Sequence, residues 1–335
     1  MSDAFNQRCC ALVEELGLGA AGDVTEVVPL TGGVASDIAM VALADRRICV
    51  KFALPKLKVA ADWHAPVHRN AAEYAWLKVA AEQVPDSAVQ LFGRSEAQHG
   101  FAMEFLDGAD VYLWKSALLD EAPDQGEAAR VADMVGRIHA ASAEVGFDRA
   151  PFQNRDDFHA LRIEPYLTYT AGQHPDLGPQ ITALADMLYD SGQVLVHGDV
   201  SPKNILLRPR GPVILDAECA TMGDASFDPA FCLNHLVLKA AQLPGSRDRL
   251  LADVSRFRAA YAPHVTWEAP EVLEARICRL LPALMLARVD GKSPVEYLDE
   301  TTRAQVRRIA IALIRDPSDR LDDLVARIAT ELKDE

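Results

Sequence analysis

The feature that most constrains this chain is the segment 195–207, LVHGDVSPKNILL, together with VILDAECA at 213–220. In each segment a short apolar run, of the kind found in buried strands, ends abruptly at polar residues. The polar side chains that follow the two runs are Asp199, Asn204, Asp216 and Glu218. We therefore expect three carboxylates and one amide in loops at the ends of short strands, held in place by buried apolar neighbours.

This set of side chains is the one that phosphoryl transfer requires. One aspartate orients the attacking hydroxyl, while an asparagine and a second aspartate hold Mg²⁺ against the phosphates of a nucleotide. An HxDxxxxN pattern arises readily by chance, but one followed by an apolar strand that ends in DxE does not. The two segments together predict a phosphoryl-transfer site.

Composition excludes several other classes of protein. With 335 residues, the chain is long enough for two domains or one bilobal fold. Its net charge of −15, from 34 basic and 49 acidic residues, disfavours a nucleic-acid partner. No window approaches the ~18 apolar residues of a membrane span. Charged residues interrupt the N-terminal segment, which argues against a signal peptide. The six cysteines show no CxxC spacing, which argues against a disulfide or zinc site. We expect a cytoplasmic protein without a membrane partner.

The first third of the chain has the pattern of a small antiparallel sheet with one inserted helix. A helix is expected at 4–16 and another at about 69–82. The expected strands are 24–30, 38–43, 47–52, 89–92 and 101–105.

From residue 106 onward the pattern changes to long amphipathic helices. They are expected near 126–145, 155–171, 177–190, 228–243, 246–261, 268–288 and 300–332, the last interrupted at 316–318. Within this half, only 194–216 has the character of strand. We predict an α+β bilobal protein, with a nucleotide-binding lobe at 1–105. A helical lobe at 106–335 would carry the catalytic loop, metal site and acceptor pocket, with the ligand between the lobes.

Candidate nucleotide contacts lie in the first lobe. Gly32 and Gly33 separate two apolar runs, and without a Cβ their backbone N–H groups can approach phosphate oxygens. Lys51 ends the β-type run ICVKF, and Glu73 follows on the expected helix, within reach of its ammonium group. A hairpin turn, a solvent-facing lysine and a solvated helix residue are the alternative interpretations.

A hinge completes the series of candidate nucleotide contacts. In MEFLDG, a strand runs into an extended segment whose backbone could hydrogen-bond an adenine edge. Its leading residues are Met103, Glu104 and Phe105. Each of these features is weak alone, but their order before HGD, Asn and DxE is specific.

That order resembles the protein-kinase-like fold in its small-molecule branch, over about residues 25–235. The branch contains aminoglycoside phosphotransferases, choline kinases, homoserine kinases and methylthioribose kinases. The protein-kinase motifs HRD, DFG and APE are absent, with HGD and DAE in place of the first two. The resemblance therefore implies a protein-kinase-like bilobal fold and a small-molecule acceptor.

The resemblance also implies roles for the polar residues. Asp199 would be the catalytic residue that orients or deprotonates the acceptor hydroxyl. Asn204 and Asp216 would ligate Mg²⁺, and Glu218 would contribute directly or through water. Supporting roles in the loop fall to Asp228 and His197. The implied cofactors are Mg²⁺ and ATP, with GTP as an alternative donor.

Two parts of the chain resemble different sub-families. Residues 51–77, with K-x-A-L-P, Trp63 and R-x-x-x-E, are similar to methylthioribose kinases, which suggests a homodimer. The SPKN loop is closer to aminoglycoside phosphotransferases and choline kinases. Arg288, Asp290 and Lys292 either line the acceptor pocket or belong to a solvated helix end.

One further motif is set aside. Residues 17–22, GLGAAG, match the dinucleotide fingerprint, but they follow a helix and precede a strand, so we interpret them as a helix end. The leading hypothesis is a kinase that transfers the γ-phosphoryl group of ATP to a small-molecule hydroxyl, on a sugar, amino alcohol, aminoglycoside or methylthioribose. The alternatives are a catalytically silent binding protein on the same scaffold and a protein Ser/Thr kinase.

Overall fold

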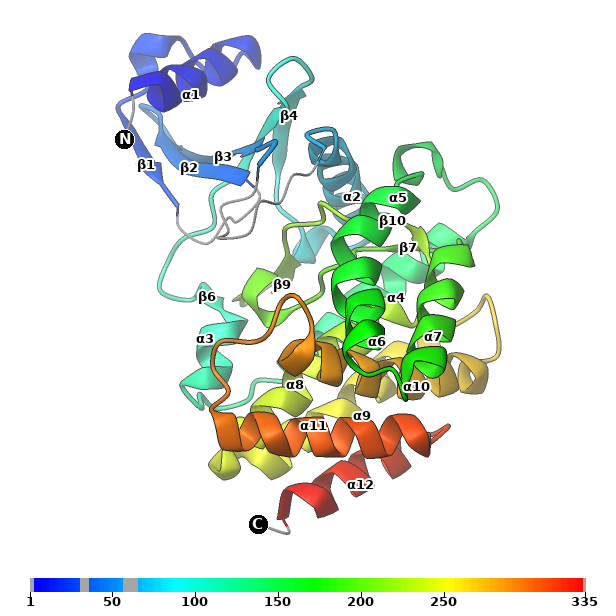
Figure 1. The fold of residues 1–335 in the computed structure, drawn as a ribbon. Helices are drawn as coiled ribbons and strands as arrows, with labels where there is room; N and C mark the ends of the chain where they lie inside the picture. The colour runs from blue at the N-terminus through cyan, green and yellow to red at the C-terminus, as the bar shows by residue number, and fades with distance from the viewer. Residues whose placement is uncertain (1–2, 31–35, 57–65, 334–335) are drawn as a thin grey trace.

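The computed structural model describes residues 3–30, 36–56 and 66–333. A small sheet with helix α1 (Asp3–Glu15) beside it stands above a larger body made mostly of helices (Figure 1). This is the α+β bilobal arrangement expected from the sequence, although the boundary at residue 105 stays a prediction. Gly17 has a φ of +65° in the turn that ends α1, and a short 3-10 helix at Ala21–Asp23 follows, so residues 17–22 come after a helix and not after a strand.

The N-terminal sheet is antiparallel throughout, in the order β1-β2-β3-β5-β4. Its strands are β1 (Glu26–Pro29), β2 (Ser36–Ala42), β3 (Arg47–Ala53), β4 (Leu91–Ser95) and β5 (Gly100–Glu104). Side chains alternate along β3, so Ile48, Val50 and Phe52 pack against the apolar side of α1. Cys49 and Lys51 consequently lie on the opposite face.

That opposite face is covered by helix α2 (Arg69–Gln83). Trp76 and Leu77 of α2 share a core cluster with Cys49 and Phe101 of the sheet. Because both faces of β3 are covered, Lys51, which lies on the same face as Cys49, has a relative exposure of only 2%. The alternative of a solvent-facing Lys51 is therefore excluded.

Helices make up most of the second lobe. Those in its first half are α3 (Trp114–Leu119), α4 (Glu127–Ala143), α5 (Arg155–Phe158), α6 (Tyr169–Gln173) and α7 (Gly178–Asp190). Those in its second half are α8 (Phe227–Gln242), α9 (Arg247–Tyr261), α10 (Pro270–Asp290), α11 (Glu300–Arg315) and α12 (Leu321–Lys333). Helix α8 is buried along almost its whole length and forms the centre of this lobe. The break between α11 and α12 lies where the sequence predicted it.

The expected single helix at 155–171 is divided into three pieces. Between α5 and α6, the segment His159–Thr168 is a π-helix with Pro165 inside it. A proline lacks the N–H group that a regular α-helix would use, and wider π-turns recur at functional sites. This π-helical segment carries Arg162, which contacts the candidate active site.

The expected strand region at 194–216 forms short antiparallel ribbons, and it pairs with two short strands outside that region that the sequence did not predict. Strand β7 (Val194–Val196) pairs with β10 (Thr221–Gly223). Strand β8 (Ile205–Arg208) pairs with both β6 (Tyr112–Leu113) and β9 (Gly211–Ile214). The loops after β7 and β9 carry the polar residues singled out in the sequence.

Candidate active site

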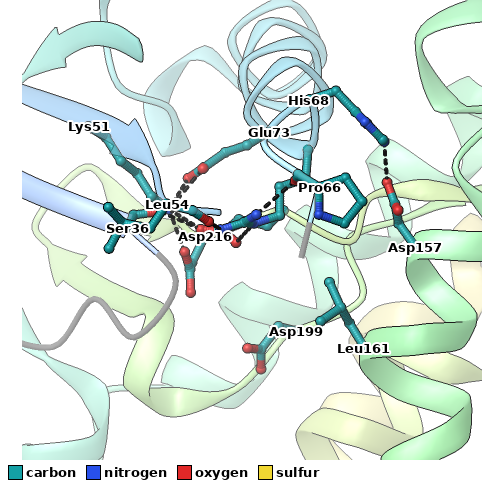
Figure 2. A network of polar contacts seen from close by, with 12 residues as sticks. Ser36, Lys51, Leu54, Pro66, His68, Glu73, Asp157, Leu161, Asp199 and Asp216 are labelled. Carbon is teal, nitrogen blue, oxygen red and sulfur yellow. Dashed lines mark hydrogen bonds and ion pairs between the residues drawn. The ribbon is translucent and has the colours of Figure 1, made fainter. Parts of the chain in front are cut away.

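Lys51 is the centre of a buried ionic network (Figure 2). Both carboxylate oxygens of Glu73 lie 2.8 Å from Lys51 Nζ, which also donates a hydrogen bond to Asp216 Oδ1. Glu218 Oε1 is 3.3 Å away. Burial alone would lower the pKa of Lys51, but the three carboxylates outweigh it and raise that pKa well above its usual value. The lysine is therefore a fixed positive charge that contacts Glu73, while its role toward a nucleotide stays a prediction.

Asp216 and Asn204 are the best-placed candidate metal ligands. Asp216 has a φ of +72°, a strained backbone for a non-glycine residue, and its side chain is 36% exposed. Its Oδ2 has no partner among the described residues. The amide nitrogen of Asn204 donates to the carbonyl of Asp199 at 3.1 Å, which leaves its oxygen available. Carboxylate and amide oxygens are ligands that suit Mg²⁺.

A second arrangement of carboxylates also fits a cation. Glu73, Asp216 and Glu218 each present an oxygen within 4.8 Å of the others. Glu218, however, is 6% exposed, and Ser36 Oγ and Arg69 Nε donate to its two oxygens at 2.6 Å each. Its oxygens are thus engaged by the protein, and direct metal ligation by Glu218 stays a prediction.

Arg69 connects the start of α2 to the catalytic lobe. It is fully buried and donates hydrogen bonds to the carbonyls of Pro66 at 2.7 Å and Leu54 at 2.8 Å, besides its ion pair with Glu218. The neighbouring His68 contacts Asp157 of α5 at 2.7 Å, as Figure 2 shows. These contacts fix the start of α2, and with it Glu73, against the second lobe.

Asp199 lies between two cations. Its Oδ2 is 3.0 Å from Arg162 Nη2 and 3.2 Å from Lys203 Nζ, and the residue is 4% exposed. Burial acts to raise the pKa of Asp199, but the charges of Lys203 and Arg162 outweigh it and lower that pKa below its usual value. The carboxylate is therefore ionised and fixed in place.

Asp228 holds the loop that follows β7 in place. Its two oxygens accept hydrogen bonds from the backbone N–H groups of His197 at 2.7 Å and Gly198 at 2.9 Å. The ring of His197 in turn accepts from the backbone N–H of Asp199 at 3.1 Å. Burial lowers the pKa of His197, which favours the neutral form that this hydrogen bond requires. These contacts agree with the supporting roles expected for both residues.

A cavity of about 440 Å³ lies between the two lobes. Its size is ordinary for a small-molecule site. The predicted site residues on its wall are Lys51, Glu73, Met103, Glu104, Phe105, Asn204 and Asp216. Asp199 and Glu218 are not on this wall, but they contact Lys203 and Lys51, which are. Gly32, Gly33 and Trp63 lie outside the described residues.

Three basic residues of the site had no assigned role in the sequence. Lys203 stands four residues after Asp199 inside the motif itself, so its position was a usable signal. Arg69 opens the R-x-x-x-E pattern, which was noted only as a sub-family resemblance. Arg162 comes from the π-helical segment, and no local pattern connects it to Asp199.

A family model now accounts for this arrangement. The model of the phosphotransferase enzyme family matches residues 26–264, more than half of the chain. The chain belongs to this family. No curated protein sequence matches this phosphotransferase at a significant level.

Solved structures show the same fold. A choline/ethanolamine kinase family protein from Mesorhizobium loti has a TM-score of 0.53 at 15% identity, covering 98% of this chain and 95% of that chain. An ethanolamine kinase from Plasmodium vivax has a TM-score of 0.51 at 10% identity, covering 97% and 87%. A choline kinase from Streptococcus pneumoniae has a TM-score of 0.50 at 14% identity, covering 97% and 98%. At these identities the likeness concerns the fold.

Several predictions from the sequence are thereby confirmed. The resemblance to the aminoglycoside phosphotransferase and choline kinase group and the bilobal fold are confirmed. The expected enzyme class, a phosphotransferase with an alcohol group as acceptor, is confirmed at the level of the family. Within the part of the chain that the structure describes, no helix has the length and apolar character needed to cross a membrane. The homodimer stays a prediction.

Proposed function

We propose that this phosphotransferase is an ATP- and Mg²⁺-dependent kinase that transfers the γ-phosphoryl group to a hydroxyl of a small molecule. The observation that carries the proposal is the placement of ionised Asp199 beside a cavity lined by Lys51, Asn204 and Asp216. Lys51 would contact the nucleotide phosphates, Asn204 and Asp216 would hold the metal, and Asp199 would meet the acceptor, which are the parts that phosphoryl transfer requires.

The nucleotide would lie along the cavity from the hinge to the ionic network. Met103, Glu104 and Phe105 line the hinge end, where an adenine ring would find apolar side chains and an extended backbone. Lys51, held by Glu73, would contact the phosphates at the other end. Its fixed charge stabilises negative charge on the phosphates without further rearrangement. GTP as a donor remains an alternative.

Asp216 and Asn204 would hold Mg²⁺, with Glu218 contributing directly or through water. The available oxygens of the first two residues fit a hard cation. When bound, the cation would neutralise charge on the phosphates. Lys51 donates a hydrogen bond to Asp216. The lysine that would contact the phosphates and the aspartate that would hold the metal therefore belong to one cluster.

Asp199 would accept a hydrogen bond from the acceptor hydroxyl and align its oxygen with the γ-phosphorus. Because its pKa is lowered, this carboxylate is a weak base, so alignment is its main contribution. The hydroxyl proton passes to Asp199 as the new O–P bond forms and the bond to ADP breaks.

Six free cysteines agree with a cytoplasmic location, where conditions keep thiols reduced.

The test is a phosphotransfer screen with defined acceptors. ADP release is measured with ATP and GTP as donors, with Mg²⁺ or EDTA, and the phosphorylated product is identified by mass spectrometry. Mg²⁺-dependent transfer to at least one hydroxyl compound supports the proposal. Tight nucleotide binding without transfer to any acceptor would instead favour the catalytically silent alternative.

A further inference from the structure

A set of basic side chains gathers in the second lobe near Asp199. We call it the basic wall, and it consists of Arg162, Lys203, His235, Lys239 and Arg288. The first two contact Asp199 directly. The other three come from the buried helix α8 and from the end of α10. None of these three is used by the proposed chemistry.

Aromatic rings connect the parts of the basic wall. Tyr166 of the π-helical segment packs against Phe231 of α8 with ring centroids 5.4 Å apart, and Phe231 packs against His235 at 5.5 Å. Arg288 Nη1 donates to Tyr166 Oη at 3.2 Å. Phe231, His235 and Lys239 are spaced by four residues and therefore share one face of α8. The basic wall is continuous across α8, α10 and the π-helical segment.

His235 lies between the two ends of the basic wall. Burial, together with the charges of Arg288 and Lys239, lowers the pKa of His235 well below its usual value, whereas the charge of Asp199 acts in the opposite direction. Neither ring nitrogen has a hydrogen-bond partner elsewhere in the described chain. A neutral imidazole without a partner keeps both its donor and its acceptor unused.

Lys239 is a buried cation without an anionic partner. It is 1% exposed, and no carboxylate of the described residues lies within ion-pair distance of it. Its Nζ is instead 4.7 Å from the centroid of the Tyr297 ring. Burial, with smaller contributions from Lys115 and Arg288, lowers the pKa of Lys239 to about 7. An uncompensated buried charge is costly, and a bound anion would offset that cost.

Arg288 presents an unused edge of its guanidinium group. Its Nη1 is fixed by Tyr166 Oη and by Ser293, whose Oγ is 3.0 Å away. Its Nε is buried without a hydrogen-bond partner, and Nη2 makes no hydrogen bond to the residues described. Nε and Nη2 together form the edge that binds a carboxylate or phosphate through two parallel hydrogen bonds.

Carboxylates in the same region are already neutralised. The pairs are Glu296 with Lys115, Glu164 with Lys292, and Asp290 with Arg307 and His174. Asp199 itself has two cationic partners. A cationic alcohol would therefore meet positive charge on this side of the site, with no free carboxylate to receive it among the described residues of the region.

We propose that the acceptor is a small hydroxylated anion whose carboxylate or phosphate binds Arg288 on the basic wall while its hydroxyl reaches Asp199. This inference rests on the proposed function and names the chemical class of its acceptor. Lys239 and His235 support the anion from α8. Choline and ethanolamine, named for structurally similar kinases, are by contrast cationic alcohols.

Matched acceptors that differ in charge test this inference. One series is glucosamine, glucose, glucuronate and glucose 6-phosphate; the other is 3-amino-1,2-propanediol, glycerol, glycerate and glycerol 3-phosphate. Binding is measured by calorimetry on the full-length protein with Mg²⁺ and a non-hydrolysable ATP analogue, and turnover by ADP release. We expect the anionic members of at least one series to bind about 10-fold or more tightly than the neutral member, because charge-assisted hydrogen bonds are strong. The two anions in each series distinguish carboxylate from phosphate.

Variants locate the charge preference. Arg288→Met and Lys239→Met should each reduce the preference for the anion by about 10-fold, and Arg288→Lys should restore part of it. Lys78→Met, which removes an exposed lysine of α2, is the matched control and should change nothing. Mg·ATP affinity and the melting temperature verify that each variant is folded.

The outcomes separate this inference from the proposed function. Equal binding across both series, a preference for the cationic members, or a folded Arg288→Met protein that keeps its preference for anions would overturn the inference. Anion-selective binding without any ADP release would contradict the proposed function and leave the anion site standing. ADP release confined to neutral or cationic acceptors would do the reverse.

Discussion

Asp199 and Asp216 are both carboxylates beside cations, yet their surroundings suit them to different tasks. Asp199 is almost fully buried between Arg162 and Lys203, so its orientation is fixed. Among the described residues, Asp216 has Lys51 as its ion-pair partner, and its partly exposed side chain lines the cavity. In each case burial alone would raise the pKa and neighbouring lysines lower it, so both groups are ionised at neutral pH. The first suits hydroxyl alignment and the second suits metal binding.

Asp199→Asn tests the alignment role. The amide keeps the size of the carboxylate but cannot take the proton, so kcat should fall by at least about 10²-fold, the usual contribution of a positioned base. Mg·ATP affinity should change little, because the metal ligands are intact. Calorimetry with the nucleotide and ADP release with the best acceptor give the two measurements. Near-normal turnover in a folded variant would remove Asp199 from the mechanism.

Lys239 gives a prediction about stability and pH. Its pKa is about 7 in the folded protein and about 10.4 in an unfolded chain. The cost of its burial is therefore fully present below pH 7 and is relieved as the pH rises toward 10. Lys239→Met lacks this cost, so below pH 7 its free energy of unfolding should exceed that of the wild type by about 1–4 kcal/mol. Urea unfolding at pH 6.5 and pH 9.5 measures both values.

Comparing the free energies of unfolding at those two pH values tests whether the charge of Lys239 causes the difference. The advantage of Lys239→Met should shrink at pH 9.5, since the wild-type amine is then mostly neutral. Lys115, Arg288 and Glu296 supply charges that act on Lys239, and the Tyr297 ring lies next to its ammonium group. The substitution leaves all four of these residues in place. Lys78→Met serves as the control. Lower stability of Lys239→Met at both pH values would indicate that the lysine is held for packing rather than for a ligand.

Elements with a regular period could be predicted from the sequence, and those that depend on irregular backbone could not. The strand that carries Lys51 and the helix that carries Glu73 follow from alternation and from a 3.6-residue period. The π-helical segment has neither period, so residues 155–171 were predicted as one helix. Arg162 lies on that segment, which explains why its contact with Asp199 could not be found from local patterns.

Helix α2 depends on Glu218 for its position, and this gives a test of what Glu218 does. Glu218→Gln removes the negative charge opposite fully buried Arg69, so the melting temperature should fall clearly, as expected when a buried pair is broken. If Glu218 acts mainly through Arg69, Mg·ATP affinity should fall less than in Asp216→Asn. Thermal unfolding and nucleotide calorimetry on both variants decide between the roles. Equal losses of Mg²⁺-dependent affinity would identify Glu218 as a direct ligand.

The whole molecule combines a net charge of −15 with a basic wall at its site. Taken alone, that net charge would suit a cationic substrate or simply reflect diffuse surface charge, because a sum of charges cannot show where they lie. In the sequence, Arg288, Asp290 and Lys292 are equal candidates for the acceptor pocket. The structure separates them, because Asp290 and Lys292 have ion-pair partners, whereas Arg288 keeps an unused edge. Long-range packing makes that distinction.

The core is also a property of the whole molecule, and it leads to the last prediction. One hydrophobic cluster includes Cys49 and Phe101 of the sheet as well as the buried side of α8, so it crosses from one lobe to the other. The two lobes should therefore unfold in a single calorimetric transition. Mg·ATP at about 100 times its Kd should stabilise that transition by about 2.7 kcal/mol, because the ligand binds the folded state. Replacing Mg²⁺ with EDTA should remove most of the shift. In Asp216→Asn, the shift with Mg²⁺ should already be as small as the shift that the wild type shows with EDTA. Lys78→Met should behave as the wild type. Two transitions, of which the nucleotide moves only one, would mean that the lobes fold independently and that the cavity belongs to a single lobe.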